Sequence, residues 1–454
     1  MAQQVDVVVI GMGVGGEAVA GQLAEAGLAV VGIENKLVGG ECPYWGCVPT
    51  KMMIRAANLI AETRRVDGMA GHADVTPDWE PVAARIREEA TDDWNDQVAV
   101  DRFTDKGGQF VRGRARLAGH GVVEVNGETL EASRGVVLAT GTAPVAPPID
   151  GLNDTPFWTN REAVEAKSLP ASMLVLGGGA IGLELAQAFA RFGVDVSIVE
   201  AMDRLLPDDE PEASALLEGV LAADGIAIRT STRASAVRHD GEQFAVTVGD
   251  GDEMTAEKLL VAVGRRAELA DLGLETVGLD PHARAIKVDE HMRAGDRVWA
   301  IGDVTVHGGF THMAMYHAAI AARDILGEAG PPADYRAVPR VTFTDPEIGV
   351  VGLTEADARA AGVHAAVGVA QVPSSARGWI HKAGNDGFIK LVADTEHGVL
   401  VGATSAGPTG GEVLSALAVA VHARVPVGAL RHMIYAYPTF HRGIEDALRD
   451  LESR

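Results

Sequence analysis

Two stretches of the chain carry the same pattern: an apolar run, three closely spaced glycines, an alanine-containing segment and a second apolar run that ends in glutamate. The pattern predicts a strand, a tight turn, a helix and a second strand, which together form a βαβ unit. In such a unit the first glycine permits the tight turn and the second lets a pyrophosphate approach the backbone. The third lets the helix pack on the strand, and the glutamate can accept hydrogen bonds from ribose hydroxyls.

The two copies lie far apart in the chain. The first copy has Gly11, Gly13, Gly16 and Glu34 in these positions, and the second has Gly177, Gly179, Gly182 and Glu200. Two such sites in one chain predict two dinucleotides, a tightly held flavin and a nicotinamide that exchanges. Glu200 favours NADH over NADPH because a carboxylate repels a 2′-phosphate. Arg204, which lies close in sequence, works against that preference.

Both cysteines of the 454-residue chain lie in one short segment that contains prolines and glycines. Cys42 and Cys47 are too far apart to form a disulfide on a regular helix, so a bridge requires a distorted turn. The glycine and prolines around them supply such backbone restrictions. The run from Lys51 reads as a helix, and a thiol at a helix start has a stabilised thiolate. Two buried apolar cysteines or a metal half-site are the alternatives, although metal sites of this kind usually take four ligands.

The composition excludes some classes of binding partner and favours one cellular compartment. The net charge of −24 and the pI of about 4.9 argue against nucleic acid or an anionic membrane as partner. No apolar run approaches the roughly 20 residues of a membrane span. The chain enters a strand at once, so we expect no signal peptide. Two cysteines in so long a chain favour the reducing cytoplasm, where a disulfide tends to be catalytic.

Further motifs connect these features to a known family. They lie at 139–141, 263–265, 300–303, 343–347 and 351–355. Together with the cysteine segment and the glycine fingerprints, they resemble the class I flavoprotein disulfide reductases, which include dihydrolipoamide dehydrogenase, glutathione reductase and mercuric reductase. The resemblance covers nearly the whole chain and implies FAD, NAD(P)H and a homodimer. It adds Gly141, Gly264, Gly302 and Asp303 to the cofactor-binding residues, the last as a ligand of the ribityl chain.

The implied architecture is an α/β fold with two Rossmann-like dinucleotide-binding domains and a C-terminal α+β dimerisation domain. We expect an FAD-binding segment at 1–150, an NAD(P)-binding domain at 151–270, an FAD-binding return segment at 271–335 and an interface domain at 336–454. Proline-rich turns near 147–151 and 331–332 fit these breaks. Apolar positions over 80–103 recur with a helical period.

The resemblance also implies an electron path from NADH through the flavin to a Cys42–Cys47 disulfide, and from there to a small disulfide or another thiol-reactive acceptor. It gives Cys47 the role of the thiolate that faces the flavin and Cys42 the attack on the acceptor. Lys51 matches the family lysine near the flavin, and Glu184 matches its ion-pair partner. By sequence alone Glu184 can also be a solvated helix position. Thr50 can cap the following helix whatever the chemistry.

The C-terminal segment departs from the family pattern His-Pro-Thr-x-x-Glu, whose His–Glu pair is the acid/base for thiol–disulfide exchange. Tyr437 stands in place of the histidine and Arg442 in place of the glutamate. A phenol with a pKa of about 10 is a poor base near neutrality. Three interpretations stay open: a packing substitution, a non-disulfide acceptor, or a base displaced to His441, which shares a helix face with Glu445 at a spacing of four.

Two other functions therefore compete with the disulfide relay. One is a flavin-centred reductase of quinones, metal ions or a second nicotinamide, as in soluble transhydrogenase, with the cysteines vestigial or regulatory. The other is a flavin-binding protein with structural or sensing duties and no turnover. The identity of the small-molecule acceptor does not follow from this sequence, because specificity of this kind lies in the geometry of the site.

Overall fold

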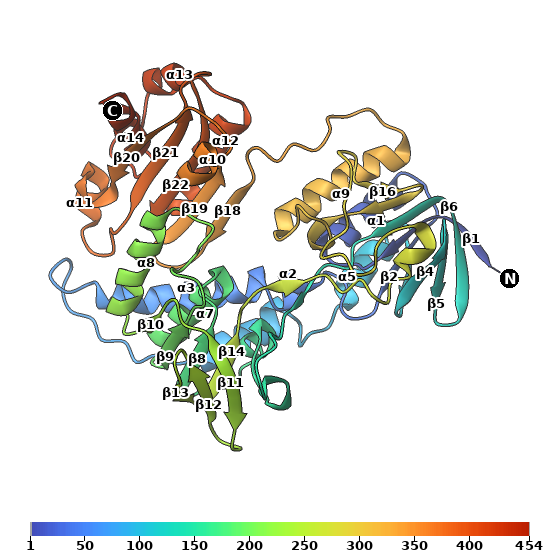
Figure 1. The fold of residues 1–454 in the computed structure, drawn as a ribbon, viewed down its shortest axis with the longest axis horizontal. Helices are drawn as coiled ribbons and strands as arrows, with labels where there is room; N and C mark the ends of the chain where they lie inside the picture. The colour runs from blue at the N-terminus through green and yellow to red at the C-terminus, as the bar shows by residue number, and fades with distance from the viewer. Residues whose placement is uncertain (1, 454) are drawn as a thin grey trace. The chain divides into compact units, whose positions relative to one another are not determined.

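The computed structural model describes residues 2–453, which divide into two compact units, each assembled from separate stretches of the chain. The first unit comprises the chain up to Pro49, Ala83–Val145 and Gly264–Asp334. The second comprises Thr50–Val82, Ala146–Val263 and the chain from Tyr335 on. Both units combine sheets with helices (Figure 1). The predicted α/β fold class is confirmed.

The first unit is built on a sheet in the order β16-β17-β6-β1-β2-β3, with β4 and β5 added to β6 as an antiparallel meander. β1, β2, β3, β6 and β17 run parallel. The strands are β1 (Gln3–Ile10), β2 (Val30–Glu34), β3 (Gln109–Arg112), β4 (Ala115–Gly119), β5 (Val122–Val125), β6 (Glu128–Leu138), β16 (Arg293–Gly295) and β17 (Val298–Ala300). The predicted first βαβ unit is confirmed as β1, α1 (Val14–Glu25) and β2.

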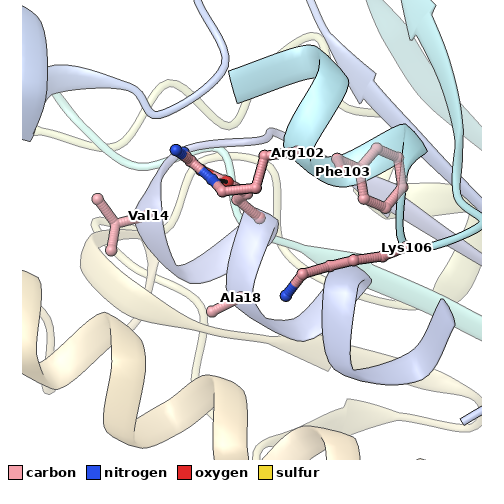
Figure 2. A pocket seen from close by; sticks show the side chains of 6 residues that line it. Val14, Ala18, Arg102, Phe103 and Lys106 are labelled. Atoms are coloured by element: carbon pink, nitrogen blue, oxygen red, sulfur yellow. Dashed lines mark hydrogen bonds and ion pairs between the residues drawn. The ribbon is translucent and has the colours of Figure 1, made fainter. Parts of the chain in front are cut away.

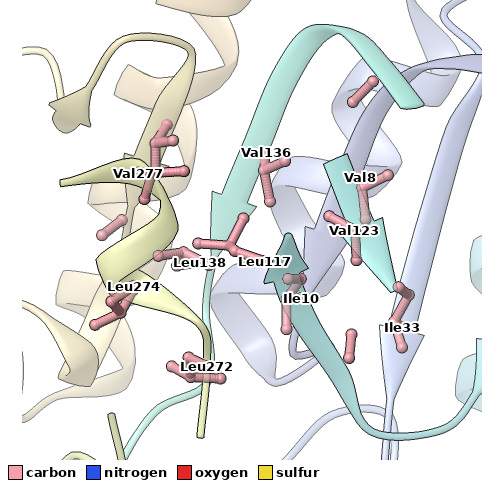
Figure 3. Packing of buried hydrophobic residues seen from close by; sticks show 14 of the residues in the cluster. Val8, Ile10, Ile33, Leu117, Val123, Val136, Leu138, Leu272, Leu274 and Val277 are labelled. Atoms are coloured by element: carbon pink, nitrogen blue, oxygen red, sulfur yellow. The ribbon is translucent and has the colours of Figure 1, made fainter. Parts of the chain in front are cut away.

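The core of this unit explains why its strand ends lie together. Val8 and Ile10 from β1 pack with Ile33 from β2 and with Val136 and Leu138 from β6 (Figure 3). All five side chains are at most 4% exposed, as expected for a parallel sheet buried on both faces. The carboxyl ends of β1 and β6 therefore lie side by side, and the glycine turn follows directly after Ile10.

The helical period predicted over 80–103 is interrupted. α4 (Glu80–Arg85) continues into a π-helical turn, η1 (Ile86–Ala90), but residues 92–94 then adopt left-handed conformations, with φ between 47 and 57°. Such a run cannot continue a right-handed helix, and a new helix, α5 (Gln97–Thr104), follows. Val98 is 67% exposed instead of lying on the buried face. The prediction of one continuous period is therefore wrong beyond Ala90.

The second unit contains the second βαβ unit. Its sheet has the order β10-β9-β8-β14 with all strands parallel. Its elements are β8 (Ser172–Leu176), α7 (Ala180–Arg191), β9 (Asp195–Val199), α8 (Pro211–Ala223), β10 (Ala227–Arg229) and β14 (Lys258–Val261). An antiparallel sheet of β11 (Ala234–His239), β12 (Phe244–Val248) and β13 (Asp252–Ala256) shares an apolar core with it. The predicted strand–helix–strand order is confirmed here too.

The C-terminal part of the second unit is a five-stranded antiparallel sheet in the order β18-β19-β22-β21-β20. The strands are β18 (Pro339–Thr342), β19 (Glu347–Gly352), β20 (Ala365–Gln371), β21 (Phe388–Asp394) and β22 (Val399–Gly407). The helices are α10 (Glu355–Ala360), α11 (Ala376–His381), α12 (Gly410–His422), α13 (Val427–His432) and α14 (Gly443–Ser453). α12, α13 and α14 contribute apolar side chains to the core of this sheet.

The remaining elements are short, apart from two longer helices. Those two are α3 (Cys47–Arg64) and α9 (Thr311–Leu326). The short ones are α2 (Glu41–Tyr44), α6 (Asn160–Val164), β7 (Ala143–Pro144), β15 (Arg265–Arg266), η2 (Leu152–Asp154), η3 (Leu274–Val277), η4 (Gly302–Val304) and η5 (Val372–Ser374). Within residues 2–453, every helix is too short or too polar to span a membrane.

Candidate active site

The three glycines of the first fingerprint differ in the space around their Cβ positions. Gly11 has a φ of +92°, and a Cβ there would lie 2.5 Å from the carbonyl oxygen of Ala139 at the end of β6. A Cβ on Gly16 would lie 1.9 Å from the carbonyl oxygen of Gly11. A Cβ on Gly13 would meet only the Cα of Gly40, at 3.9 Å. The outer two glycines are thus required by the protein itself, whereas the middle one leaves room for a ligand at the backbone.

The carboxylate of Glu34 is fixed beside this turn. Its Oε2 accepts a hydrogen bond from the backbone N–H of Met12 at 2.8 Å, and its Oε1 accepts one from the N–H of Lys36 at 2.8 Å. Two donors hold the side chain at the carboxyl end of β2, where the fingerprint requires a ribose acceptor.

Other predicted flavin-binding residues gather in the same unit. Gly141, which follows β6, has a φ of +66° and open space at its Cβ position. Gly302 donates its N–H to Nδ1 of His317 at 3.1 Å, and burial lowers the pKa of His317 to about 4, so the ring stays neutral and can accept. Asp303 accepts a hydrogen bond from the N–H of Gly309 at 2.9 Å. The buried hydroxyl of Thr140 has no hydrogen-bond partner in the described chain. An orphaned hydroxyl beside the open position at Gly141 fits an extended polar cofactor such as FAD.

The segment that carries the cysteines lies on the first fingerprint. Gly39, with a φ of +103°, donates its N–H to the carbonyl of Met12 at 2.7 Å and forms a bridge with Gly13. A Cβ on Gly40 would lie 2.9 Å from the Cα of Gly13. Only glycine permits this approach, so the segment that carries the cysteines and the first fingerprint are joined by backbone contacts.

The two cysteines lie on either side of a break between α2 and α3. The N–H groups of Trp45 and Gly46 both donate to the carbonyl of Glu41, at 2.8 and 2.7 Å. This tight turn confirms the distortion that the cysteine spacing predicts. Cys47 is the first residue of α3, so the helix begins earlier than the sequence indicates, and Thr50 lies inside it. The interpretation of Thr50 as a helix cap is wrong.

The two sulfurs share hydrogen bonds with each other and with one hydroxyl. A hydrogen bond to Cys47 and burial raise the pKa of the Cys42 thiol, and a bond to Thr311 acts in the opposite direction. Cys47 Sγ lies 3.3 Å from Oγ1 of Thr311, the first residue of α9. The sequence interpretation missed Thr311, because no local motif marks a residue that far from the cysteines in the chain.

A second pair of residues missed from the sequence lies beside Cys42. A carboxylate oxygen of Glu41 is 3.3 Å from an Nη2 of Arg265. Arg265 also donates to the hydroxyl of Thr142 at 3.0 Å and to its carbonyl at 2.8 Å. Arg265 thereby places a positive charge next to the carboxylate that precedes Cys42. The preceding residue, Gly264, has a φ of +122° and open space at its Cβ position.

In the second unit, Lys51 and Glu184 form an ion pair. Nζ of Lys51 lies 2.7 Å from Oε2 of Glu184, which is 5% exposed. The other oxygen of Glu184 accepts the N–H of Phe343 at 2.8 Å, and Nζ of Lys51 lies 4.6 Å from the centre of the Phe343 ring. The solvated-face interpretation of Glu184 is therefore wrong, and the expected pair is present.

The glycines of the second fingerprint repeat the geometry of the first. A Cβ on Gly177 would lie 2.5 Å from the carbonyl oxygen of Ala262, and one on Gly182 would lie 2.3 Å from that of Gly177. A Cβ on Gly179 would meet nothing within 4 Å. These positions fit a dinucleotide pyrophosphate as the first fingerprint does.

The acidic residue of this fingerprint is held in the same way. Glu200 accepts the N–H groups of Gly178 and Met202 at 2.5 and 2.6 Å and is 8% exposed. Arg204 donates to the backbone carbonyl of Pro207. The cation that weighed against NADH in the sequence is thus engaged by a nearby carbonyl group.

The C-terminal candidates are not assembled into a dyad in this chain. His441 precedes α14, and its Nδ1 lies 3.2 Å from the hydroxyl of Thr439. Glu445 pairs with Arg442 at 2.9 Å and with Arg449. The expectation that His441 and Glu445 share one helix is wrong. Tyr437 is 70% exposed, with the Arg442 guanidinium 5.4 Å from its ring centre.

A small surface hollow between α1 and α5 does not add to this site (Figure 2). Its cations are already neutralised, since Arg102 lies 2.5 Å from Glu17 and Lys106 lies 3.3 Å from Glu25. Among residues 2–453, no group of three or more His, Cys, Asp and Glu side chains is arranged to hold a metal ion.

Comparisons with known proteins define the class of protein. Residues 5–322 match the family model described as pyridine nucleotide-disulphide oxidoreductase, and residues 338–448 match the dimerisation domain of the same family. The chain belongs to the pyridine nucleotide-disulphide oxidoreductase family. It is an oxidoreductase of a class that uses FAD and NAD(P)H, and its dimerisation domain indicates a homodimer.

Individual relatives carry different activities. The chain is 34% identical to a mercuric reductase of Streptomyces lividans, over 99% of this chain and 96% of the relative. It is 35% identical to a dihydrolipoyl dehydrogenase of Halobacterium salinarum, over 97% of this chain and 95% of the relative. A Cu(II) complex of the HOCl-induced flavoprotein disulfide reductase RclA from Escherichia coli superimposes with a TM-score of 0.87 at 26% identity, covering 99% of both chains. Overall similarity therefore does not select one acceptor.

Proposed function

We propose that the protein passes electrons from NADH through FAD to a Cys42–Cys47 disulfide, and from the resulting dithiol to a small thiol-reactive acceptor. The observation that carries this proposal is the position of the two cysteines. Both sulfurs lie in a segment whose backbone is joined to the first fingerprint, and they share a hydrogen bond with each other. Cys47 is exposed and Cys42 is half-buried, which argues against a pair of buried structural cysteines.

Bound FAD supplies a two-electron carrier between NAD(P)H and the disulfide. Gly13 leaves room for its pyrophosphate in the turn that Gly11 and Gly16 make possible, and Glu34 offers its carboxylate to a ribose. The hydrogen bond from the N–H of Gly309 to Asp303 supports the proposal of this carboxylate as a ligand of the ribityl hydroxyls. In the second unit Glu184 fixes the charged end of Lys51, the residue expected near the flavin.

The proton balance of the cysteine step fits the shared hydrogen bond. A hydride from NADH brings two electrons and one proton. Breaking the S–S bond with these gives one thiol and one thiolate, so no further proton source is needed. The raised pKa of Cys42 supports Cys42 as the thiol that keeps the proton and Cys47 as the thiolate. Transfer of that proton along the hydrogen bond to Cys47 leaves Cys42 as the thiolate that attacks the acceptor.

The C-terminal segment bears on the type of acceptor. Exchange with a disulfide needs a base to move the proton between sulfurs. This chain has Tyr437 and Arg442 in the family's acid/base positions, and Glu445 is paired with arginines rather than with His441. We infer that an acceptor that binds thiolates directly, such as a soft metal ion, is reduced faster than a glutathione-sized disulfide.

The same departure keeps a second candidate function in view, a flavin-centred reductase of quinones, metal ions or a second nicotinamide. Replacing Cys47 by serine separates the two. The disulfide relay predicts loss of at least 100-fold in acceptor reduction, on the order of the loss expected for a covalent catalytic group. Near-complete retention of activity would support flavin-centred chemistry instead. The FAD content of the variant, measured from its visible spectrum, controls for loss of the cofactor.

NADH is the proposed electron donor. The carboxylate of Glu200 is buried and fixed by two backbone N–H groups, so it cannot turn away from a 2′-phosphate. The cytoplasm as the compartment is also a proposal, which rests on the two cysteines and the chemistry assigned to them.

A further inference from the structure

The hydroxyl of Thr311 contacts both sulfurs of the cysteine pair. Its Oγ1 lies 3.3 Å from Cys47 Sγ, and a hydrogen bond from Thr311 also reaches Cys42. All three residues belong to the first unit. A hydroxyl can donate only one proton at a time, so it serves whichever sulfur carries the negative charge.

Two helix starts converge where this contact is made. Cys47 is the first residue of α3, which has 18 residues, and Thr311 is the first residue of α9, which has 16. The N-terminus of a helix carries a partial positive charge that favours a thiolate. A hydroxyl at such a position has a backbone environment that favours donation of its proton toward an anion.

The segment that presents Thr311 is held in place on both sides. A Cβ on Gly308 would lie 2.3 Å from the Cα of Asp303, so the turn before α9 is closely packed. The ring of Phe310 stacks on that of His312 at 5.2 Å. A Cβ on Gly15 would lie 3.1 Å from the side chain of Ala314, which shows how closely α9 packs against α1. The hydroxyl is therefore positioned by the fold, and not by a flexible loop.

We propose that Thr311 donates its hydroxyl proton to Cys47 and stabilises that sulfur as the thiolate of the reduced pair. This inference rests on the proposed function, in which the reduced pair contains one thiol and one thiolate. A disulfide sulfur is a weak acceptor and a thiolate is a strong one, so the bond is stronger after reduction. Thr311 thus favours the reduced pair and keeps Cys47 ready to donate electrons near neutral pH.

Charged and titratable groups on the surrounding elements also act on the pair. Cys42 itself and Glu41 stand on α2, and the Glu41 carboxylate is neutralised by Arg265 on β15. Asp303 on η4 accepts the N–H of Gly309, and His312 follows Thr311 on α9. Lys51 lies one turn after Cys47 on α3. Removing the Thr311 hydroxyl takes away its contact with Cys42 as well as that with Cys47, so the substitution is tested in a background that lacks the Cys42 thiol.

The test uses the FAD-containing protein with Cys42→Ser, which leaves Cys47 as the only cysteine. Alkylation of Cys47 by iodoacetamide is followed by mass spectrometry as a function of pH, with and without Thr311→Val. We expect the midpoint pH to rise by about one unit in the valine variant, a tenfold loss of thiolate at neutral pH, since a hydrogen bond to a charged group has about that strength. Thr311→Ser, which keeps the hydroxyl, should restore the original midpoint.

An unchanged midpoint in Thr311→Val would overturn the inference. If the valine variant does not retain FAD, Thr311→Ala, which adds no bulk, replaces it under the same criterion. Alkylation does not depend on turnover, so the outcome is separate from that of the proposed function. Retained activity in Cys47→Ser would reject the disulfide relay, whereas an unchanged alkylation midpoint rejects only the role of Thr311.

Discussion

The two glycine fingerprints have the same internal geometry but different surroundings. In both, a Cβ added to either outer glycine would lie 2.5 Å or less from a backbone carbonyl oxygen, and the acidic residue accepts two backbone N–H groups. The middle glycine differs. Gly13 is bridged by Gly39 and approached by Gly40, whereas Gly179 has nothing within 4 Å of its Cβ position.

This difference indicates how one motif serves two uses. In the first fingerprint the segment after β2 returns across the glycine turn and brings the cysteines with it. We expect this segment to cover a cofactor bound there and to keep it bound. Among residues 2–453, nothing lies within 4 Å of the Cβ position of Gly179, which suits a nicotinamide that binds and leaves. The segment that follows the βαβ unit, and not the unit itself, sets the difference.

The largest expected effect comes from blocking the third glycine of each fingerprint. In Gly16→Ala the new Cβ would lie 1.9 Å from a backbone carbonyl, so the turn must shift, and we expect loss of most bound FAD. In Gly182→Ala the distance is 2.3 Å, and we expect FAD to be retained while the KM for NADH rises at least about tenfold. Visible absorption spectra and steady-state kinetics measure the two results.

Gly219→Ala on α8 is the matched control, because its Cβ position is open and its φ is not positive. It should change neither FAD content nor the KM for NADH. Loss of FAD in both fingerprint variants, to the same degree, would show that the two sites do not differ in the way described.

On the flavin side of the comparison, we expect an effect of pH on stability that arises from His317. Burial lowers the pKa of His317 to about 4, from an ordinary value near 6.5, so the unfolded chain binds the proton first as the pH falls. The contribution of neutral His317 to the free energy of unfolding is fully present above pH 6.5 and is lost as the pH falls from 6.5 to 4. The total loss is at most about 3 kcal/mol. Unfolding by denaturant at several pH values measures this loss. In His317→Gln, whose amide oxygen can still accept the N–H of Gly302, that pH dependence should be reduced.

The second fingerprint offers a test of nucleotide choice. Replacing Glu200 by serine removes the charge that opposes a 2′-phosphate, together with the carboxylate that accepts the N–H of Gly178. We expect the ratio of kcat/KM for NADH over NADPH to fall about tenfold, equal to about 1.4 kcal/mol. Glu34→Ser is the counterpart in the first fingerprint and should leave this ratio unchanged. An unaltered ratio in Glu200→Ser would remove the argument for NADH.

The smallest effect concerns the ion pair between Lys51 and Glu184. Glu184→Gln keeps the shape but removes the buried charge, and the Lys51 side chain, 34% exposed, can turn to water. We expect a loss of about 1 kcal/mol in unfolding free energy, kept small by that exposure. Chemical denaturation measures it. The absorption maximum of the flavin should shift if Lys51 lies near it, whereas a stability change with an identical spectrum would assign the pair a structural role only.

Much of the fold and of the two nucleotide sites was predictable from the sequence, because glycine turns and strand-end carboxylates act locally. Gly11, Gly16 and Glu34 follow one another within a single βαβ unit, and steric rules decide their positions. The turn between Cys42 and Cys47 was predictable for the same reason. These features depend on neighbours within a few tens of residues.

The remaining parts of the site depend on contacts between distant segments. Thr311 reaches Cys47, and Arg265 reaches Glu41, across more than 200 residues of sequence. The burial of Glu184 depends on Phe343, which lies in the last third of the chain. Local helical spacing also misled at Glu445, where two arginines offer stronger partners than His441 does.

The central claim is that the cysteine pair takes up electrons from the flavin, and an anaerobic titration with NADH tests it most directly. The account predicts uptake of four electrons per subunit, with a long-wavelength absorption band at the halfway stage that disappears in Cys47→Ser. Uptake of two electrons, with no such band and the same result in Cys47→Ser, would contradict it.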